Sequence, residues 1–395
     1  MFASLISLFA VSMMFVAPEV ESPAPPSLVD EAALEQSGFV RYWSGRLPLS
    51  DGESVRSAHL VDENIYFISD LGGVYAVEAG TGLIRWAINL SEPYLSIYKP
   101  HHFRTASDRN VVVFATSSKV NILDRYTGEI LASSGLHAAE GSAIIAQPDA
   151  LFMGSYDGRF YSLYMPRFAS KKLIPRWEVV TDGPVTAAPI FDGQGRLVFA
   201  SRGGKVYACE PGDKTYLWSF DADGPILGDP AGGPDGVYVA RMDRSLYKLE
   251  GTSGEKLWQS RFPWPLSEGP VFVARTVYQY CEKTGLSAID SETGKVRWRI
   301  DNGRSLAAHS GDRDIVHTTD GKLLMVDHTN GEVLAIIGAP TVMSCLSNIT
   351  DNAIYAYSAG GELFCAKPDS VPYLRRQQIL AARAQLNQPP KQPEA

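Results

Sequence analysis

Apolar and polar residues alternate with period two in short runs along most of this chain, which is the pattern of β-strands. One such run, residues 72–78, is Gly-Gly-Val-Tyr-Ala-Val-Glu. Seven similar runs begin at Ser118, Gly158, Gly204, Arg244, Thr284, Gly321 and Gly361. Successive runs start 37 to 46 residues apart, and a repeat near 40 residues predicts a β-propeller with one blade per copy.

The sequence around each run predicts three further strands. A β-rich segment such as residues 64–68 comes before the run, and most runs are followed by a turn with Thr or Ser before Gly. Glycine suits this turn because it adopts positive φ without steric cost. A strand that ends in tryptophan then follows, as in residues 293–298. Each repeat therefore predicts four antiparallel strands, which we call A, B, C and D.

Tryptophan occupies the same place in strand D of most repeats. The six residues at this place are Trp43, Trp86, Trp177, Trp218, Trp258 and Trp298, whereas the second and seventh repeats carry Ala132 and Ala335. We expect each indole to pack between neighbouring blades while its N–H finds an acceptor. Stacking on a ligand is the alternative, but a ring of similar tryptophans favours the packing role.

The two ends of the repeat region complement each other. The eighth repeat has no fourth strand after Lys367, whereas residues 39–44 near the N-terminus look like a strand D without a blade. We predict that residues 39–47 complete the last blade, which removes the free edge of the ring. The predicted fold is therefore all-β: an eight-bladed β-propeller of four-stranded antiparallel blades over residues 39–368, closed by an N-terminal strand.

The segments outside the propeller differ from it in composition. Residues 1–17 are strongly apolar and carry no charge, which predicts a signal peptide or an uncleaved anchor and hence an extracytoplasmic location in the periplasm or cell envelope. Residues 18–38 are expected to be a linker. In the tail, residues 369–395, we expect a short amphipathic helix within 373–386 and then disorder.

Charge and cysteine content exclude several classes of function. The formal net charge of -8 argues against a nucleic-acid partner, because phosphate binding requires a concentrated basic surface. None of Cys209, Cys281, Cys345 and Cys365 forms a C-x-x-C pair, so no zinc or redox motif is predicted. We expect buried thiols at these positions, and the sequence leaves a disulfide open.

The strand ending in Asp or Glu, the Thr-Gly turn and the strand ending in Trp together resemble the PQQ-like repeat family, over residues 39–367. That family includes quinoprotein alcohol dehydrogenases, and also BamB-like propellers that act as non-catalytic scaffolds in outer-membrane protein assembly. Resemblance to the dehydrogenase branch implies a longer chain. It also implies an adjacent Cys-Cys pair that stacks on the quinone, and acidic and Asn ligands for calcium. This chain has no adjacent pair and no C-x-x-C-H haem site.

The resemblance therefore implies a scaffold that binds a protein partner in the cell envelope and needs no cofactor. The alternative is an oxidoreductase that uses PQQ with calcium at a reduced site. Other catalytic motifs, such as a P-loop, a G-x-S-x-G elbow or H-E-x-x-H, do not occur. The sequence thus favours a protein that is not an enzyme.

Two groups of residues are candidates for a site. The A strands should line the central channel, and they are expected to contain His59, His102, Asp229, Glu268 and His309. Converging histidines and carboxylates can bind a metal, although solvated pore-lining groups are the simpler interpretation. Asp312 and Asp314 lie at a predicted turn without the spacing of a calcium loop.

The second group lies on two connections between strand D and the next strand A. Residues 90–104 contain Tyr94 and Tyr98, and Trp264 lies between Pro263 and Pro265, outside the docking places. These connections emerge on one side of the ring. Exposed aromatic residues beside proline are typical of partner-binding surfaces, and loops packed on the propeller are the alternative.

Overall fold

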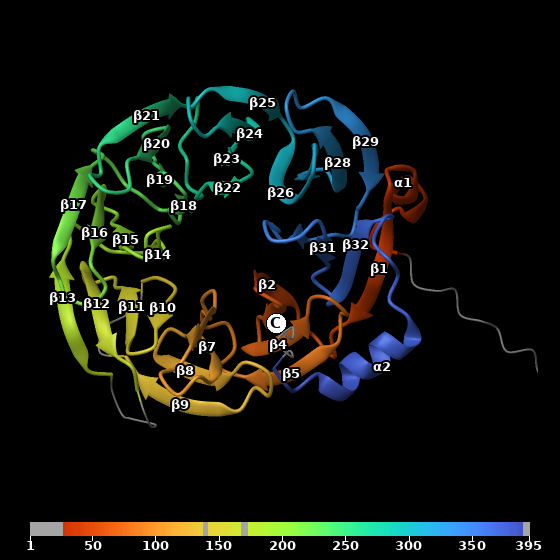
Figure 1. The fold of residues 1–395 in the computed structure, drawn as a ribbon, viewed down its shortest axis with the longest axis horizontal. Helices are drawn as coiled ribbons and strands as arrows, with labels where there is room; N and C mark the ends of the chain where they lie inside the picture. Colours follow the sequence, from red (N-terminus) through yellow and green to blue (C-terminus); the bar gives the residue numbers. More distant parts are fainter. Residues whose placement is uncertain (1–26, 137–140, 167–172, 390–395) are drawn as a thin grey trace, which may run out of the picture.

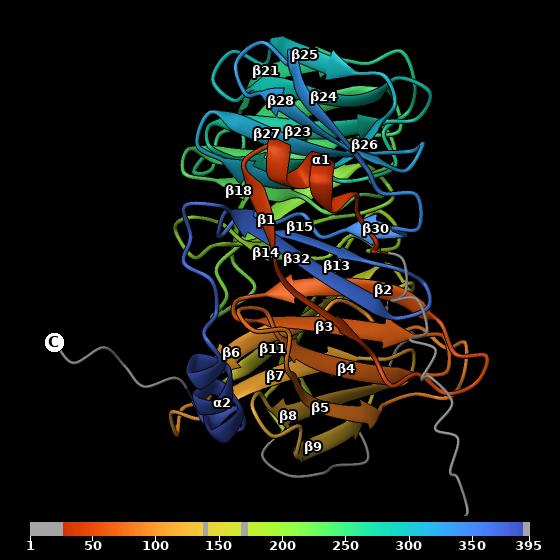
Figure 2. The ribbon, with the colours of Figure 1, turned by 90° about the vertical axis from the view of Figure 1, so that its right-hand side faces the viewer.

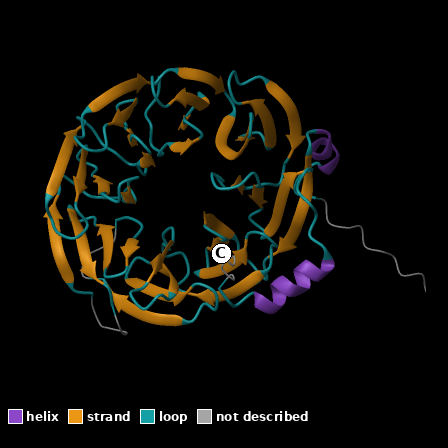
Figure 3. Ribbon diagram, in the orientation of Figure 1, coloured by secondary structure: helices purple, strands orange, loops and turns teal. Residues whose placement is uncertain are grey.

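Eight four-stranded antiparallel sheets follow one another around a closed ring (Figure 1). This is a computed structural model, which describes residues 27–136, 141–166 and 173–389. The first strand of each sheet lies nearest the axis and the fourth lies at the rim (Figure 3). The predicted all-β, eight-bladed propeller is therefore confirmed. The predicted signal peptide or anchor, residues 1–17, lies outside the described residues.

The first four blades use consecutive strands. Blade 1 contains β2 (Val55–Val61), β3 (Asn64–Ser69), β4 (Gly73–Glu78) and β5 (Ile84–Asn89). Blade 2 contains β6 (His101–Arg104), β7 (Asn110–Ala115), β8 (Lys119–Asp124) and β9 (Ile130–Gly135). Blade 3 contains β10 (Ile145–Gln147), β11 (Ala150–Gly154), β12 (Arg159–Tyr164) and β13 (Pro175–Val180). Blade 4 contains β14 (Ile190–Phe191), β15 (Leu197–Ala200), β16 (Lys205–Cys209) and β17 (Tyr216–Asp221).

The last four blades repeat this order, except that the eighth borrows its outer strand. Blade 5 contains β18 (Ala231–Gly233), β19 (Gly236–Ala240), β20 (Ser245–Leu249) and β21 (Lys256–Arg261). Blade 6 contains β22 (Val271–Val273), β23 (Thr276–Cys281), β24 (Gly285–Asp290) and β25 (Val296–Ile300). Blade 7 contains β26 (Gly303–Ser310), β27 (Arg313–Thr318), β28 (Lys322–Asp327) and β29 (Val333–Gly338). Blade 8 contains β30 (Ser344–Cys345), β31 (Ile354–Tyr357), β32 (Glu362–Pro368) and β1 (Phe39–Arg46).

Strand β1 closes the ring. It pairs antiparallel with β32, from Phe39 opposite Pro368 to Arg46 opposite Glu362. The predicted closure by residues 39–47 is thus confirmed. Because the two ends of the chain meet in one sheet, every blade has a neighbour on both sides and the ring has no free edge.

Strand-D tryptophans join five of the eight blades to the blade that follows. The indole N–H donates to a carbonyl in the C–D turn of the following blade: Trp43 to Ala79 at 2.9 Å, Trp86 to Arg125 at 3.1 Å, Trp218 to Gly251 at 2.8 Å, Trp258 to Ser291 at 3.0 Å and Trp298 to His328 at 2.9 Å. The ring plane lies on the glycine of that turn, so no side chain fits there. This arrangement confirms the packing role for these five residues. The indole nitrogen of Trp177 has no hydrogen-bond partner among the described residues.

The expected linker, residues 18–38, requires a correction, because it is packed on the propeller from Leu28 onward. Helix α1 (Glu31–Gln36) contacts β29, and Leu34 is fully buried. Ala33 packs into the same cluster as Ala335, the residue that replaces tryptophan in blade 7. Blade 8 has no C–D turn because its outer strand comes from the N-terminus, so α1 fills the place that an indole and a turn occupy elsewhere.

Antiparallel strands place the connections on two faces. The A–B and C–D turns lie on one face, which we call the A–B face, and the B–C turns and D–A connections lie on the other, the D–A face (Figure 2). Helix α2 (Arg376–Gln385) forms within the predicted segment 373–386 and buries none of its residues. No helix of the described residues is long and apolar enough to cross a bilayer.

Candidate functional site

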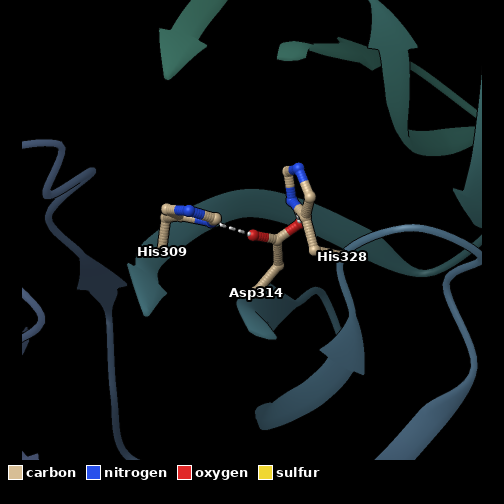
Figure 4. A group of neighbouring side chains, drawn as sticks. All are labelled: His309, Asp314 and His328. Atoms are coloured by element: carbon tan, nitrogen blue, oxygen red, sulfur yellow. Dashed lines mark hydrogen bonds and ion pairs between the residues drawn. The ribbon is translucent and has the colours of Figure 1, made fainter. Parts of the chain in front are cut away.

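A buried carboxylate lies at the centre of a polar cluster at the boundary of blades 6 and 7. Asp314, at the start of β27, is fully buried and accepts hydrogen bonds from three side chains. Its Oδ1 lies 2.8 Å from His309 Nδ1, and its Oδ2 lies 3.0 Å from His328 Nδ1 and 2.6 Å from the Tyr278 hydroxyl. Figure 4 shows the two imidazoles on either side of the carboxylate.

The surroundings keep this carboxyl group ionised. Burial alone would raise the pKa of Asp314, but the hydrogen bonds from His309, His328 and Tyr278 lower it below its usual value. Burial and the adjacent carboxylate raise the pKa of Tyr278, so its hydroxyl stays protonated and donates. The cluster is therefore an acceptor surrounded by donors, with the nitrogens of two histidines directed at one carboxylate.

Sequence reasoning found only one member of this cluster. The sequence predicts His309 as a channel residue and Asp314 at a turn, and it gives no local signal for His328 or Tyr278. The missed signal is an aspartate inside the apolar alternation of strand B. Ligand atoms of His309, Asp314 and His328 all lie within 4.8 Å of one another, so these residues could hold a metal ion.

A second cluster lies at the boundary between blades 1 and 2. His102 is buried there, and its Nε2 lies 2.7 Å from the Tyr66 hydroxyl and its Nδ1 lies 2.9 Å from Asp62. Asp62, Glu63 and His102 also lie close enough together to hold a metal ion, but Arg125 lies 3.2 Å from Glu63 and 3.8 Å from Asp62, so these carboxylates already have a cationic partner. The side chain of His102 is only 3% exposed and contacts the preceding blade.

The other candidate channel residues form separate contacts. The side chain of His59 is partly exposed. Loss of hydration among the surrounding protein atoms, and then the charge of Lys99, lower its pKa to about 3. The protein atoms around Asp229 raise its pKa although it is exposed, and its Oδ1 accepts from the Ala188 N–H at 2.7 Å. Asp229 precedes β18 and does not lie within a strand.

Glu268 likewise precedes its blade's first strand, β22. Both of its oxygens pair with Arg304, at 2.8 and 2.9 Å. The guanidinium of Arg304 lies over the ring of Tyr280, 4.4 Å from the centroid. This carboxylate therefore has a cationic partner, and His59, Asp229 and Glu268 share no hydrogen bond or ion pair among the described contacts.

The three aromatic candidates on the D–A connections differ in exposure. Trp264 is 43% exposed, and Lys283 Nζ lies 4.2 Å from the ring centroid. Tyr94 is 73% exposed, whereas Tyr98 packs against the core cluster of blades 2 and 3. Tyr94 lies between blades 1 and 2 and Trp264 between blades 5 and 6, across the ring from each other, so the two do not form one compact patch.

A cavity of about 600 Å³ lies between blades 2 and 3 at the rim of the ring. Ala132, one of the two residues that replace tryptophan in strand D, contributes to its wall together with Leu131 and Met165. Pro166, the last described residue before the gap at 167–172, also lines it.

The four cysteines are free and buried. Burial raises the pKa of both Cys209 and Cys345 to about 12, so neither thiol is ionised near neutral pH. The expectation of buried thiols is confirmed, and no disulfide joins them.

Comparison with known proteins finds BamB in a family model, among the relatives and among the solved structures. The family described as "Outer membrane protein assembly factor BamB" matches residues 174–300 and 249–369. BamB of Yersinia pestis is 22% identical over 333 residues, which cover 77% of this chain and 71% of BamB. The serine/threonine-protein kinase AfsK of Streptomyces griseus is 33% identical over 97 residues, but these span 12% of the kinase.

A solved structure extends the likeness to the whole ring. The crystal structure of BamB from Moraxella catarrhalis superposes with a TM-score of 0.65 at 17% identity, covering 85% of this chain and 99% of that one. This superposition shows a common fold. With the eight repeats, the Thr-Gly turns and the docked tryptophans, these matches identify the chain as a β-propeller of the PQQ-like repeat family, similar to BamB.

Proposed function

We propose that this protein is a non-enzymatic, extracytoplasmic scaffold that holds a protein partner in the cell envelope on the D–A face of its propeller. The observation that carries the proposal is the similarity to BamB, an outer membrane protein assembly factor, over most of both chains. The apolar, uncharged residues 1–17 support the extracytoplasmic location, because such a segment is typical of exported proteins.

The D–A face offers a suitable anchor for a partner. Trp264 is exposed between Pro263 and Pro265, which restrict its backbone and reduce the conformational entropy lost on binding. The ammonium group of Lys283 lies over one side of the ring, so the indole is oriented before a partner arrives. Exposed tryptophans of this kind often dominate interface energies. Tyr94 adds a second contact at the opposite side of the ring.

Nothing in the cysteine arrangement supports a quinone site. The quinoprotein pattern implies an adjacent pair of cysteines that stacks on PQQ. Here Cys209, Cys281, Cys345 and Cys365 are separate in sequence, and each is buried in the propeller core. The cysteines therefore do not form the adjacent pair of that pattern, and we propose a function without a cofactor.

The test is affinity capture from solubilised envelopes of the native cell, with the wild-type chain and two variants. Trp264→Ala removes the proposed anchor. Tyr216→Ala is the matched control, because Tyr216 is 48% exposed but lies on β17 at the rim. We expect one partner to be captured by the wild type and by Tyr216→Ala and to be depleted with Trp264→Ala.

Two results would contradict the proposal. If Trp264→Ala and the wild type capture the same partner equally, the D–A face at blades 5 and 6 is not the binding surface. If the purified chain takes up PQQ and calcium with a quinone absorbance band and then reduces a dye with alcohols or sugars, the protein is an oxidoreductase instead.

A further inference from the structure

Asp314 occupies a position that is aliphatic in every other blade. It pairs with Val326 on the neighbouring strand C. The residues at the same place in the B–C pairing of the other blades are Ile65, Val112, Leu151, Leu197, Val237, Val277 and Ile354, and all are fully buried. A carboxylate at such a position is strongly disfavoured unless a positive charge or several donors compensate for its burial.

The compensation comes from imidazoles and not from a lysine or arginine. In the described part of the chain, the ion-pair partners of Asp314 are His309 and His328. Two neutral imidazole nitrogens and one carboxylate oxygen are a ligand set that zinc and other divalent transition metals prefer. In blade 7, the buried aliphatic residue of the other blades is thus replaced by Asp314, which lies between two histidines that can share a metal ion with it.

The three ligands are held by regular structure. His309 lies at the end of β26, Asp314 at the start of β27 directly opposite it, and His328 immediately after β28. The ligand atoms of a tetrahedral zinc site with bonds of ~2.0–2.2 Å lie about 3.3 Å apart. The nitrogens of His309 and His328 lie 2.8 and 3.0 Å from different carboxylate oxygens, and ligand atoms of the three residues lie within 4.8 Å of one another, so an ion requires the nitrogens to move away from the oxygens they now contact.

Residues of blade 6 support these ligands from behind. The Tyr278 hydroxyl donates to Asp314 Oδ2 at 2.6 Å, and Thr276 Oγ1 lies 3.3 Å from His328 Nε2. Arg297 donates to the same Thr276 oxygen at 2.9 Å, which leaves a lone pair for an N–H on His328 Nε2. With that proton held on Nε2, loss of the Nδ1 proton that is now donated to Asp314 Oδ2 frees Nδ1 to coordinate, and outer contacts of this kind orient ligands in known metal sites.

The cluster is open to solvent on one side. The side chains of His309 and His328 are 17% and 13% exposed, whereas Asp314 is fully covered. All three lie at the A–B face, at strand ends, so an ion and a water ligand can enter without movement of the sheet. Three protein ligands and an accessible fourth position are typical of metal sites that also bind a water or another small ligand.

Blade 2 provides a natural comparison. His102 occupies the place of His309, because each pairs with the strand-B residue discussed above, Val112 or Asp314. Arg125 occupies the place of His328, since each backbone carbonyl accepts the indole N–H of the preceding blade. Blade 2 therefore has the same architecture with one of the three ligands, and its nearby carboxylates pair with an arginine.

We propose that His309, Asp314 and His328 form a binding site for a divalent transition-metal ion, with zinc as the best match, on the A–B face at the boundary of blades 6 and 7. The site is independent of the proposed partner surface, which lies on the other face. Because coordination needs neutral imidazoles, binding displaces the protons now shared with the carboxylate.

The experiment titrates the purified full-length chain, freed of any histidine tag and of metal, with Zn²⁺ in a calorimeter and with Co²⁺ in a visible spectrometer. We expect one ion per chain, a Zn²⁺-dependent rise in melting temperature and visible Co²⁺ bands typical of nitrogen and oxygen ligands. A wild-type chain that binds no ion at micromolar concentrations of Zn²⁺ would overturn the proposal.

Four variants separate this site from adventitious binding. Asp314→Val restores the aliphatic residue of the other blades, and the partly exposed His309→Gln is the milder change if the first variant misfolds. Both should abolish the single binding event. Tyr278→Phe should weaken binding about 10–100-fold, as loss of an outer contact does. His102→Gln, at the matched place in blade 2, should bind as the wild type does. Wild-type affinity in a folded Asp314→Val or His309→Gln chain would refute the assignment.

Discussion

The indole of Trp43 lies directly on Gly82, and this contact joins the N-terminal strand to the first blade of the ring. A Cβ atom on Gly82 would come within 2.5 Å of the indole ring. The same relationship recurs between Trp86 and Gly128 and between Trp298 and Gly331. The Thr-Gly turn of the repeat is therefore explained twice, by the positive φ of the glycine and by the indole that covers it.

We predict that Gly82→Ala destabilises the propeller by more than the cost of placing alanine at a positive φ. Gly52 is the matched control, because its φ of 78° resembles the 72° of Gly82 but no atom lies within 4 Å of its added Cβ. Overpacking typically costs about 1–3 kcal/mol. Urea unfolding should show this additional loss for Gly82→Ala relative to Gly52→Ala. Equal losses would mean that the indole does not depend on the glycine.

The packed N-terminal segment leads to a second prediction. Leu34 in α1 is fully buried against blades 7 and 8, whereas Leu380 in α2 is 55% exposed. Leu34→Ala should lower the free energy of unfolding by about 2–5 kcal/mol, and Leu380→Ala should change it by less than about 0.5 kcal/mol. Thermal or urea unfolding of both variants checks this, and a neutral Leu34→Ala would restore the interpretation of residues 18–38 as a linker.

The third prediction concerns acid stability. The folded-state pKa of His59 is lowered to about 3, first by burial and then by the charge of Lys99, whereas an unfolded histidine titrates near 6.5. The contribution of such a histidine to the free energy of unfolding is therefore complete above pH 6.5. It is lost as the pH falls toward 3, because the unfolded chain binds the proton first.

At pH 5 the loss from His59 amounts to about 1–2 kcal/mol, allowing for its partial exposure. Urea unfolding at pH 7, 6 and 5 should therefore show a steady decrease in stability. The slope should be smaller in His59→Gln, which cannot take up the proton. His101, whose pKa burial lowers to about 4, should behave in the same way. Identical slopes for His59→Gln and the wild type would show that His59 is solvated in the folded state.

Local patterns predicted the ring because the same local signal occurs eight times. Strand alternation, the Thr-Gly turn and the docking tryptophan are each visible within a few residues, and the missing strand after Lys367 predicted the closure by β1. The sequence did not predict the packing of helix α1, because the residues that it packs against are far from it in sequence. It fills a space left by Ala335 and by the absent C–D turn of blade 8, and neither is adjacent to it in sequence.

The candidate sites were predictable only in part for a similar reason. His102 and His309 were recognised as unusual residues of strand A, but their partners come from the preceding blade or from other strands, as with Tyr66 and Asp314. Asp229 and Glu268 were expected in strands, yet β18 and β22 begin after them. Short inner strands have few residues to define their register, so side-chain direction could not be inferred there.

The last prediction compares two tryptophans that lie six residues apart. Trp258 is a docking residue whose indole donates to the Ser291 carbonyl at 3.0 Å and lies on Gly294. Trp264 is 43% exposed on the D–A face and contacts Lys283. Trp258→Ala should cost about 3–5 kcal/mol of stability, as loss of a packed aromatic does. Trp264→Ala should leave the melting temperature nearly unchanged.

For affinity to the partner, the two variants should show the opposite order: Trp264→Ala should lose more than Trp258→Ala. If the D–A face holds the partner, Trp264→Ala should weaken the complex by about 2 kcal/mol or more, as the loss of an interface anchor does. Trp258→Ala should bind with wild-type affinity at temperatures where it remains folded. Calorimetry of folding and of binding on the same two variants makes the comparison direct, since both changes remove the same side chain. A Trp264→Ala protein that melts as early as Trp258→Ala and still binds its partner would place Trp264 in the structural core and exclude this part of the face.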